Sequence, residues 1–430
     1  METKKIGLKE AISIGIGGMV GGGIFAVLGL AVSLGQGGTP ISFLIAGIIA
    51  LLTSYSYVKL SIAFPDRGGT VKFMNQGFGK GVFSGGLNNL LWISYIVMLS
   101  LYASAFGSYA PNLYQITSSK SMDFHIYLSI IVLFAALINY YSIKVVGKIE
   151  SYAVIIKLVI LISFVFIGAY GLFGNTNVSQ LALSNWESPL KLITAGMVIF
   201  VAYEGFELIA NAVPDMQNPQ KNIPRAYYIS VIFVIFLYIV IAIITVGSLP
   251  FSQIATAQDY VLAEAAKPML GNIGFTIITI AALISTFSAI NASLYGGSRV
   301  SYEISEDDEL PHQLTYKFWN QPIGLLITTL ATLLIANMLN LESISTAGSL
   351  GFLLIFAMVN FVGYKLSKEI NGKKLIPIIG FILSSVAMIV LVVQQFSTNK
   401  VGILISIGII ATSFLIEFIY KKSERKKAKK

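Results

Sequence analysis

Three ionisable side chains interrupt long apolar stretches and are the first candidates for chemistry: Lys157, Glu204 and Glu207. Lys157 lies about eight residues into its apolar run, or ~12 Å at 1.5 Å per residue. That depth exceeds the reach of its side chain, so snorkelling to the headgroups with local membrane thinning is the weaker interpretation. Because burial disfavours a charged amine, we expect Lys157 to bind and release a proton.

The two glutamates and a pair of serines are candidate partners. Acids inside membrane segments are functional candidates by default. Glu204 would contact a substrate amine or a cationic side chain, and a structural role is an equal alternative. We expect Glu207 to be a protonated or paired acid that ties its helix to neighbours or gates the site. Ser285 and Ser288 share a helix face and would bond the Lys157 ammonium, with back-bonding to the preceding turn as the alternative.

A glycine run predicts where the first apolar segment breaks. Six glycines occupy nine residues, 15–23, and each costs about 1 kcal/mol in a helix interior. We expect an inner half that ends near Met19 and an outer half that begins near Gly22 and Gly23. The free N–H groups of the outer half suit a carboxylate, and the free carbonyls of the inner half suit an ammonium group. Close packing through small residues is the alternative.

The sixth apolar segment carries a second candidate break, over residues 200–207, and Pro214 ends it. Paired broken helices in two halves of a chain indicate a transporter site. The carbonyls of Val201, Ala202 and Glu204 would complete the ammonium site. A carboxylate site beside an ammonium site suits a free α-amino acid.

The composition sets the class of protein. Of 430 residues, 55% are hydrophobic and 11% charged, against about 25% charged in soluble domains. Lipid is therefore the solvent for most of the chain. With no cysteine, no HExxH motif and only His125 and His312, we expect no metal, no cofactor and no enzymatic activity.

The net charge of +9 is concentrated in a tail at 421–430, which indicates contact with anionic lipid headgroups rather than nucleic acid. An acidic stretch at 303–309 is expected to be a solvated loop.

We predict twelve membrane-spanning helices, each with about 20 apolar residues. They cover 10–34, 41–64, 83–109, 124–143, 150–173, 192–213, 226–249, 271–298, 322–340, 343–364, 375–396 and 401–420. Lysine and arginine concentrate in alternate loops, which places both termini in the cytoplasm of a multi-pass cell-membrane protein. Residues 1–173 and 192–366 form two five-helix units, the second inverted because five is odd. Helices at 375–420 and the tail follow.

These motifs resemble the amino acid–polyamine–organocation (APC) superfamily, and within it the broad-specificity, proton-coupled amino acid transporters. The run ending Gly23-Ile24-Phe25 is similar to the family's first-helix motif. The pattern at 200–207 is similar to that of its sixth helix, and the nonapeptide at 218–226 to its next loop.

The resemblance implies an all-α, LeuT-like fold, a 5+5 inverted repeat with discontinuous helices 1 and 6. Substrate carboxylate contacts carry over to Gly22 and Gly23, with Gly21 at the kink. Ammonium contacts carry over to the carbonyls of Met19, Val201 and Glu204. Lys157 takes the position of a second sodium ion, and Tyr203 and Phe206 are candidates for an aromatic gate. Many members carry serine or alanine within the glycine triplet, so here binding rests on backbone.

The expected function is secondary active transport of amino acids by alternating access, coupled to protons. A polyamine or cationic amino acid exchanger is the nearest alternative. A channel and a non-transporting nutrient sensor are alternatives of another class.

Overall fold

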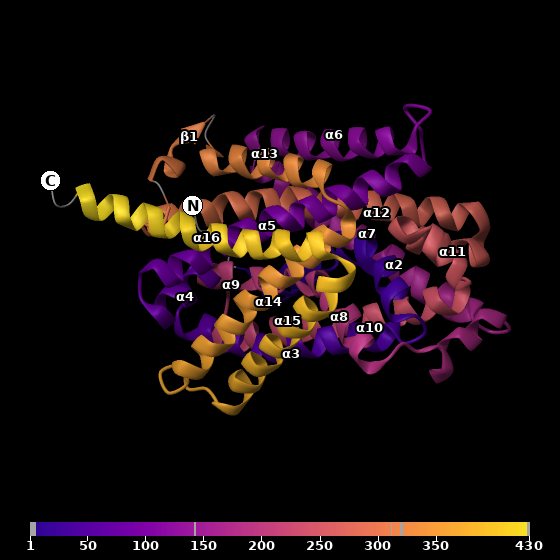
Figure 1. The fold of residues 1–430 in the computed structure, drawn as a ribbon, viewed down its shortest axis with the longest axis horizontal. Helices are drawn as coiled ribbons and strands as arrows, with labels where there is room; N and C mark the ends of the chain where they lie inside the picture. Colours follow the sequence, from indigo (N-terminus) through magenta and orange to yellow (C-terminus); the bar gives the residue numbers. More distant parts are fainter. Residues whose placement is uncertain (1–5, 142, 311, 319–320, 428–430) are drawn as a thin grey trace.

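The computed structural model describes residues 6–141, 143–310, 312–318 and 321–427, and helices dominate them (Figure 1). Within these residues, nine helices are long and apolar enough to cross a membrane. They are α3 (Thr39–Ala63), α5 (Val82–Tyr109), α6 (Lys120–Tyr141), α7 (Ile143–Gly171), α10 (Pro219–Ser248), α12 (Val261–Glu306), α14 (Leu341–Lys365), α15 (Leu375–Thr398) and α16 (Lys400–Lys427).

Two further spans are bent pairs. The helices α1 (Leu8–Met19) and α2 (Gly23–Gly35) meet at 44°, and α8 (Pro189–Val198) meets the segment Phe200–Asn211 at 54°. The second segment contains η4 (Phe200–Tyr203) and α9 (Leu208–Asn211). The protein is thus a helical, multi-pass membrane protein with breaks in both predicted segments.

Shorter elements connect these spans. The α-helices among them are α4 (Thr70–Phe78), α11 (Phe251–Thr256) and α13 (Ile323–Met338). The 3-10 helices are η1 (Ala110–Asn112), η2 (Thr176–Leu181), η3 (Leu183–Asn185), η5 (Val213–Asp215), η6 (Gln258–Tyr260) and η7 (His312–Thr315). Two short antiparallel strands, β1 (Lys317–Phe318) and β2 (Gln321–Pro322), complete the described residues.

Each of the twelve apolar segments expected from the sequence lies on one of these helices or bent pairs. The ninth predicted segment corresponds to α13, which is apolar but only 16 residues long. A helix that crosses a ~30 Å core needs about 20 residues, so the count of twelve stays a prediction. The eighth predicted segment begins at Gly271, where the backbone has a φ of 60° and α12 is kinked.

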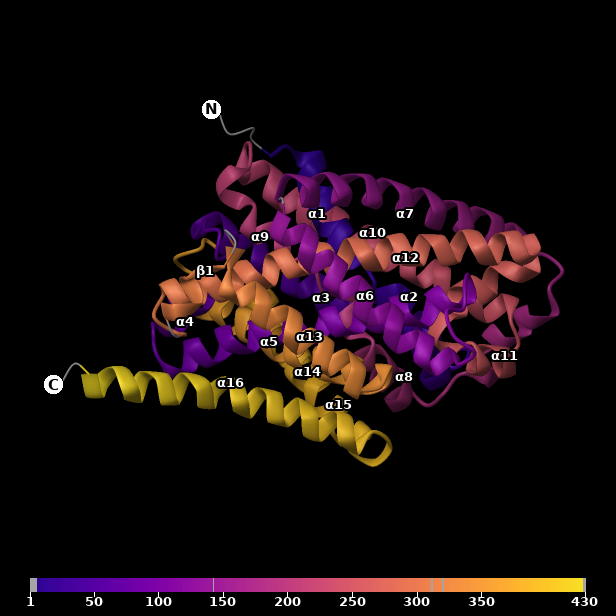
Figure 2. The same ribbon diagram turned by 90° about the horizontal axis from the view of Figure 1, so that it is seen from above.

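The centre and edge of the bundle differ in burial. In α5, 89% of the membrane-spanning window is buried, against 28% in α15 and in α16. Figure 2 shows α16 along the edge of the molecule. Large apolar side chains on the outer helices, such as Phe166 and Leu404, are exposed, as expected for a surface that meets lipid.

The first and last described segments of the chain lie in the same half of the molecule along its long axis (Figures 1 and 2). The N–H group of Ile6 donates to the Asp215 carbonyl at 2.8 Å, which ties the start of the chain to η5. The cytoplasmic location of this end stays a prediction. The basic residues that bear on this prediction are only partly described. The described part leaves out residues 1–5 and 428–430 and the side chains of 142–151 and 423–427. Lys144, Lys148 and most of the basic tail are therefore outside it.

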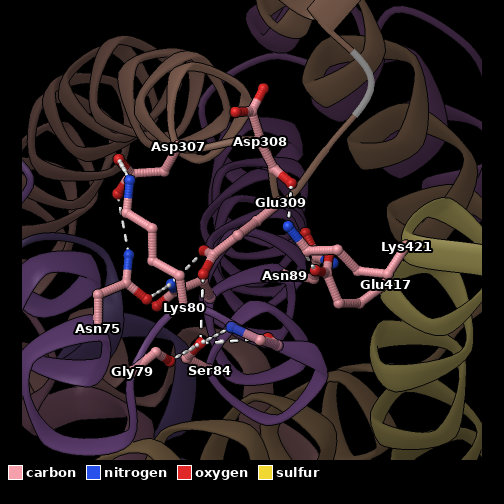
Figure 3. Close-up of polar contacts among 12 residues, drawn as sticks. Asn75, Gly79, Lys80, Ser84, Asn89, Asp307, Asp308, Glu309, Glu417 and Lys421 are labelled. Carbon is pink, nitrogen blue, oxygen red and sulfur yellow. Dashed lines mark hydrogen bonds and ion pairs between the residues drawn. The ribbon is translucent and has the colours of Figure 1, made fainter. Parts of the chain in front are cut away.

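A polar network joins the loop after α12 to its neighbours in this half (Figure 3). The Asp307 carboxylate accepts from Lys80 at 2.7 Å and from Asn75 at 2.9 Å. The ammonium of Lys421 donates to the Asp308 carbonyl at 2.7 Å. The loop thus links α4, the start of α5 and the end of α16.

Glu309 lies at the centre of the same network. Its carboxylate accepts from Asn88 at 2.6 Å and from Ser84 at 3.3 Å, and its side chain is fully buried. Burial raises the pKa of Glu309 above its usual value, although the two donors partly oppose that effect. The expectation of a solvated acidic loop is therefore wrong at this residue, because α5 provides donors for its carboxylate.

Candidate functional site

The first break lies where the glycine run predicts it. The inner helix α1 ends at Met19 and the outer helix α2 begins at Gly23. The first bond within the outer half runs from the Ala26 N–H group to the Gly22 carbonyl at 2.9 Å. The N–H groups of residues 23–25 precede it and have no acceptor within their helix. The positive end of α2 therefore faces the break.

The glycines of the break also permit close packing. A Cβ atom at Gly22 would lie 2.3 Å from Cδ1 of Tyr102, and one at Gly23 would lie 2.8 Å from Cα of Ala202. At Gly21 it would lie 2.9 Å from Cβ of Ala289. Both interpretations of the run therefore hold, because the same glycines break the helix and let neighbours approach.

The second break contacts the first. Gly205 has a φ of 118°, which favours glycine, and a Cβ there would lie 2.4 Å from the carbonyl carbon of Gly18. Ser349 of α14 supports the unwound segment, because its hydroxyl accepts from the Val201 N–H group at 3.0 Å and donates to the Val198 carbonyl at 2.8 Å. The second break thus packs directly against the last turn of α1.

Lys157 and Ser285 both bond to the carbonyl end of α1. The ammonium of Lys157 donates to the Gly17 carbonyl at 3.0 Å, and the side chain is fully buried. The snorkelling interpretation is therefore wrong. The Ser285 hydroxyl lies 3.0 Å from the Val20 carbonyl and also contacts the carbonyl oxygen of Gly21. Ser288 is buried on the same helix, and its predicted role is untested.

Tyr238 is a site residue that sequence reasoning missed. Its hydroxyl lies 2.7 Å from the Met19 carbonyl and 3.2 Å from the Ala202 carbonyl. These carbonyls come from the two broken helices, and both were expected to receive an ammonium group. A signal was available, because a tyrosine at the middle of a spanning helix needs a buried partner for its hydroxyl.

The two candidate gate residues point to different neighbours. The Tyr203 hydroxyl donates to the Phe43 carbonyl of α3 at 2.8 Å. The Phe206 ring packs against Phe356 and Tyr57, with centroid distances of 5.1 and 5.5 Å. Both side chains are fully buried, and their role as gates stays a prediction.

The two acids of the second break differ in their partners. The Glu207 carboxylate accepts from the Tyr95 hydroxyl at 3.1 Å and from the Gly205 N–H group at 2.7 Å. Glu204 is fully buried, and neither of its oxygens has a hydrogen-bond partner among the described residues. Glu207 is thus a hydrogen-bonded acid that ties the segment Phe200–Asn211 to α5.

Comparisons with known proteins identify the family of this chain. Residues 6–415 match the family model described as amino acid permease. An uncharacterised protein of Methanocaldococcus jannaschii is 36% identical over 98% of this chain and 96% of its own length. The inner membrane transport protein YbaT of Escherichia coli is 30% identical over 98% and 97%, respectively.

The serine/threonine exchanger SteT of Bacillus subtilis is 26% identical, over 86% of this chain and 85% of its own length. The matched family is one of permeases, which are transporters and not enzymes. This chain belongs to the amino acid permease family of the APC superfamily.

Proposed function

We propose that this protein is a secondary active transporter that moves free amino acids across the cell membrane by alternating access, coupled to protons. It would have twelve spans, two inverted five-helix repeats as in the LeuT-like fold, and cytoplasmic termini. The observation that carries the proposal is the contact between two unwound helices at one buried place. Unwound backbone of this kind provides N–H and C=O groups for a zwitterion.

The substrate carboxylate would bind at Gly22 and Gly23, with Gly21 at the kink. The positive end of α2 and its free N–H groups support this assignment. The ammonium group would bind carbonyls of Met19, Val201 and Glu204. Tyr238 holds the Met19 carbonyl in the present arrangement, so substrate would displace or share that bond.

Lys157 would couple transport to protons. Its bond to the Gly17 carbonyl anchors the end of α1 to α7. Ser285 anchors the next carbonyls of α1 to α12. Loss of the proton from Lys157 would weaken the first anchor and free α1 to move, which opens the site to the cytoplasm.

Uptake into proteoliposomes tests the proposal. The panel begins with serine, threonine and branched-chain amino acids, because two relatives are named as a serine/threonine exchanger and a branched-chain amino acid permease. Lysine and putrescine are added. Each is measured with and without an inwardly directed proton gradient. We expect accumulation of at least one neutral amino acid that requires the gradient. Uptake that only dissipates a solute gradient, or that requires sodium, would contradict coupling to protons.

A further inference from the structure

Glu204 is a buried carboxyl group on one of the two bent spans, and no described residue is hydrogen-bonded to it. It follows η4 at the second break, its side chain is 0% exposed, and neither oxygen is hydrogen-bonded within the described residues. Its neighbour Glu207 is equally deep, but both of its oxygens are bonded. The contrast is informative because the two acids occupy one unwound segment and differ only in their partners.

Among the described residues, Glu204 has neither an ion-pair nor a hydrogen-bond partner, and its titratable neighbour on the same segment is another acid, Glu207. Two tyrosines from neighbouring helices also lie in the electrostatic range of both acids, Tyr57 of α3 and Tyr95 of α5. Tyr227 of α10 lies in the range of Glu207. None of these described neighbours is a cation that could pair with a carboxylate at Glu204.

An ionised carboxylate in such surroundings is strongly unfavourable, and the group takes up a proton instead. Two donors, the Tyr95 hydroxyl and the Gly205 N–H group, bond the oxygens of Glu207. The two acids therefore differ in their hydrogen bonds: Glu207 has two described donors, and Glu204 has none. Sequence position alone does not make this distinction.

We propose that Glu204 is a proton-binding site, loaded while the two broken helices are closed and emptied when the second break opens to water. It is distinct from Lys157, which bonds to the end of α1. One proposed titrating group is then part of the second broken helix, and the other, on α7, bonds to the first. Release and reloading of the Glu204 proton during the cycle rests on the proposed function, whereas its presence in the closed protein does not.

Infrared spectroscopy of the purified protein in lipid tests the proposal without any substrate. A protonated carboxyl has a carbonyl stretching band that a carboxylate lacks and that shifts in heavy water. We expect this band at neutral pH, where exposed acids are ionised. Glu204→Gln should remove it and Glu204→Asp should shift it, since the aspartate retains the acid. Glu207→Gln and Lys157→Ala should both keep it.

A second buried acid gives the matched reference. Glu417 of α16 is also fully buried without a described hydrogen-bond donor, but the Lys421 ammonium lies 3.9 Å from its carboxylate, so any band that Glu417→Gln removes should differ from that of Glu204. Absence of a band assigned to Glu204 at neutral pH overturns the proposal, as does a band lost in Glu207→Gln but kept in Glu204→Gln. If the band is present but uptake is absent, the transport function fails and the proton site stands.

A substrate role for Glu204 gives another result. If Glu204→Gln retains the band and selectively loses competition by lysine, the carboxylate is ionised and binds a cationic side chain. That outcome also overturns the proposal.

Discussion

The Tyr238 hydroxyl lies 2.7 Å from the Met19 carbonyl, so α10 is bonded directly to the last residue of α1. The same hydroxyl is 3.2 Å from the Ala202 carbonyl in the second broken helix. One side chain therefore bridges two unwound segments that are almost 200 residues apart in the sequence. The bridge connects backbone that regular helices leave unbonded.

Tyr238→Phe removes this bridge and retains the ring. Two buried carbonyls lose a donor, and an unsatisfied buried group costs about 1–3 kcal/mol. We expect a lower melting temperature for the purified protein in detergent. Tyr228→Phe on the same helix is the control, because that residue is only partly buried. A Tyr238→Phe protein as stable as the wild type would show that water or another group replaces the hydroxyl.

Gly22→Ala tests how the first break is packed. The added methyl group would meet Tyr102 at 2.3 Å, and overpacking of this kind costs typically ~1–3 kcal/mol. Gly296→Ala is the matched control, since a Cβ there meets nothing within 4 Å. We expect reduced stability only in the first variant, measured by thermal unfolding.

The double variant Gly22→Ala/Tyr102→Ala separates packing from binding. Removal of the tyrosine ring gives the methyl group space, so part of the stability should return. If amino acid binding returns as well, the methyl group does not obstruct a carboxylate at Gly22, and the proposed carboxylate site is wrong.

The sequence indicates both breaks well because their causes are local. Six glycines in nine residues weaken α1, and this effect depends on no distant residue. Free carbonyls at the end of α1, the region where Lys157 bonds, were also expected, because they are predictable from the break. Contacts across the bundle were not predictable in this way. Tyr238, Ser349 and Tyr102 reach the site from helices whose relative rotation no periodicity specifies.

Burial of the acidic loop was missed for a related reason. A cluster of charges near the end of a helix usually faces water, and Glu306 does so. Glu309 turns inward because Asn88 and Ser84 offer donors from α5, more than 200 residues earlier. Only the tertiary structure brings these donors to the loop.

Glu309→Gln should stabilise the protein near neutral pH. Because burial raises the pKa of Glu309, the folded protein holds this proton more tightly than the unfolded chain. Ionisation therefore reduces stability as pH rises through the raised pKa, and this penalty disappears as pH falls to the ordinary value. The glutamine side chain is neutral, so the variant does not have this ionisation penalty.

The gain of Glu309→Gln in melting temperature should accordingly be largest near neutral pH and decline in acid. Glu306→Gln, an exposed change in the same segment, is the control and should show no such trend. A loss of stability at every pH would mean that the carboxylate is net favourable in its network.

Competition between substrates tests the carboxylate site. Neutral α-amino acids should inhibit uptake, and their decarboxylated amines should inhibit it poorly, because the N–H groups at the start of α2 would lose their acceptor. A charge-assisted hydrogen bond contributes about 1.5–3 kcal/mol, or roughly 10- to 150-fold in affinity. The measurement is inhibition of labelled amino acid uptake in proteoliposomes. Equal inhibition by the amines would favour polyamine transport instead.

Two substitutions at Lys157 separate its proton from its hydrogen bond. Lys157→Ala removes both and leaves the Gly17 carbonyl without this donor, whereas Lys157→Gln retains a donor but no group that titrates near neutral pH. If Lys157 couples transport to protons, both variants should bind substrate and neither should accumulate it in response to a pH gradient. Counterflow of unlabelled against labelled substrate should persist in Lys157→Gln, because exchange needs no net proton movement.

Lys59→Ala is the matched control for charge, since Lys59 is at the end of α3 and bonds to the Asn371 carbonyl outside the site. Its accumulation ratio should equal that of the wild type. If Lys157→Gln still concentrates substrate when the outside is acidic, the coupling proton is carried elsewhere. If only Lys157→Ala fails, the lysine serves as a hydrogen-bond donor that holds α1, and its charge is not part of the coupling.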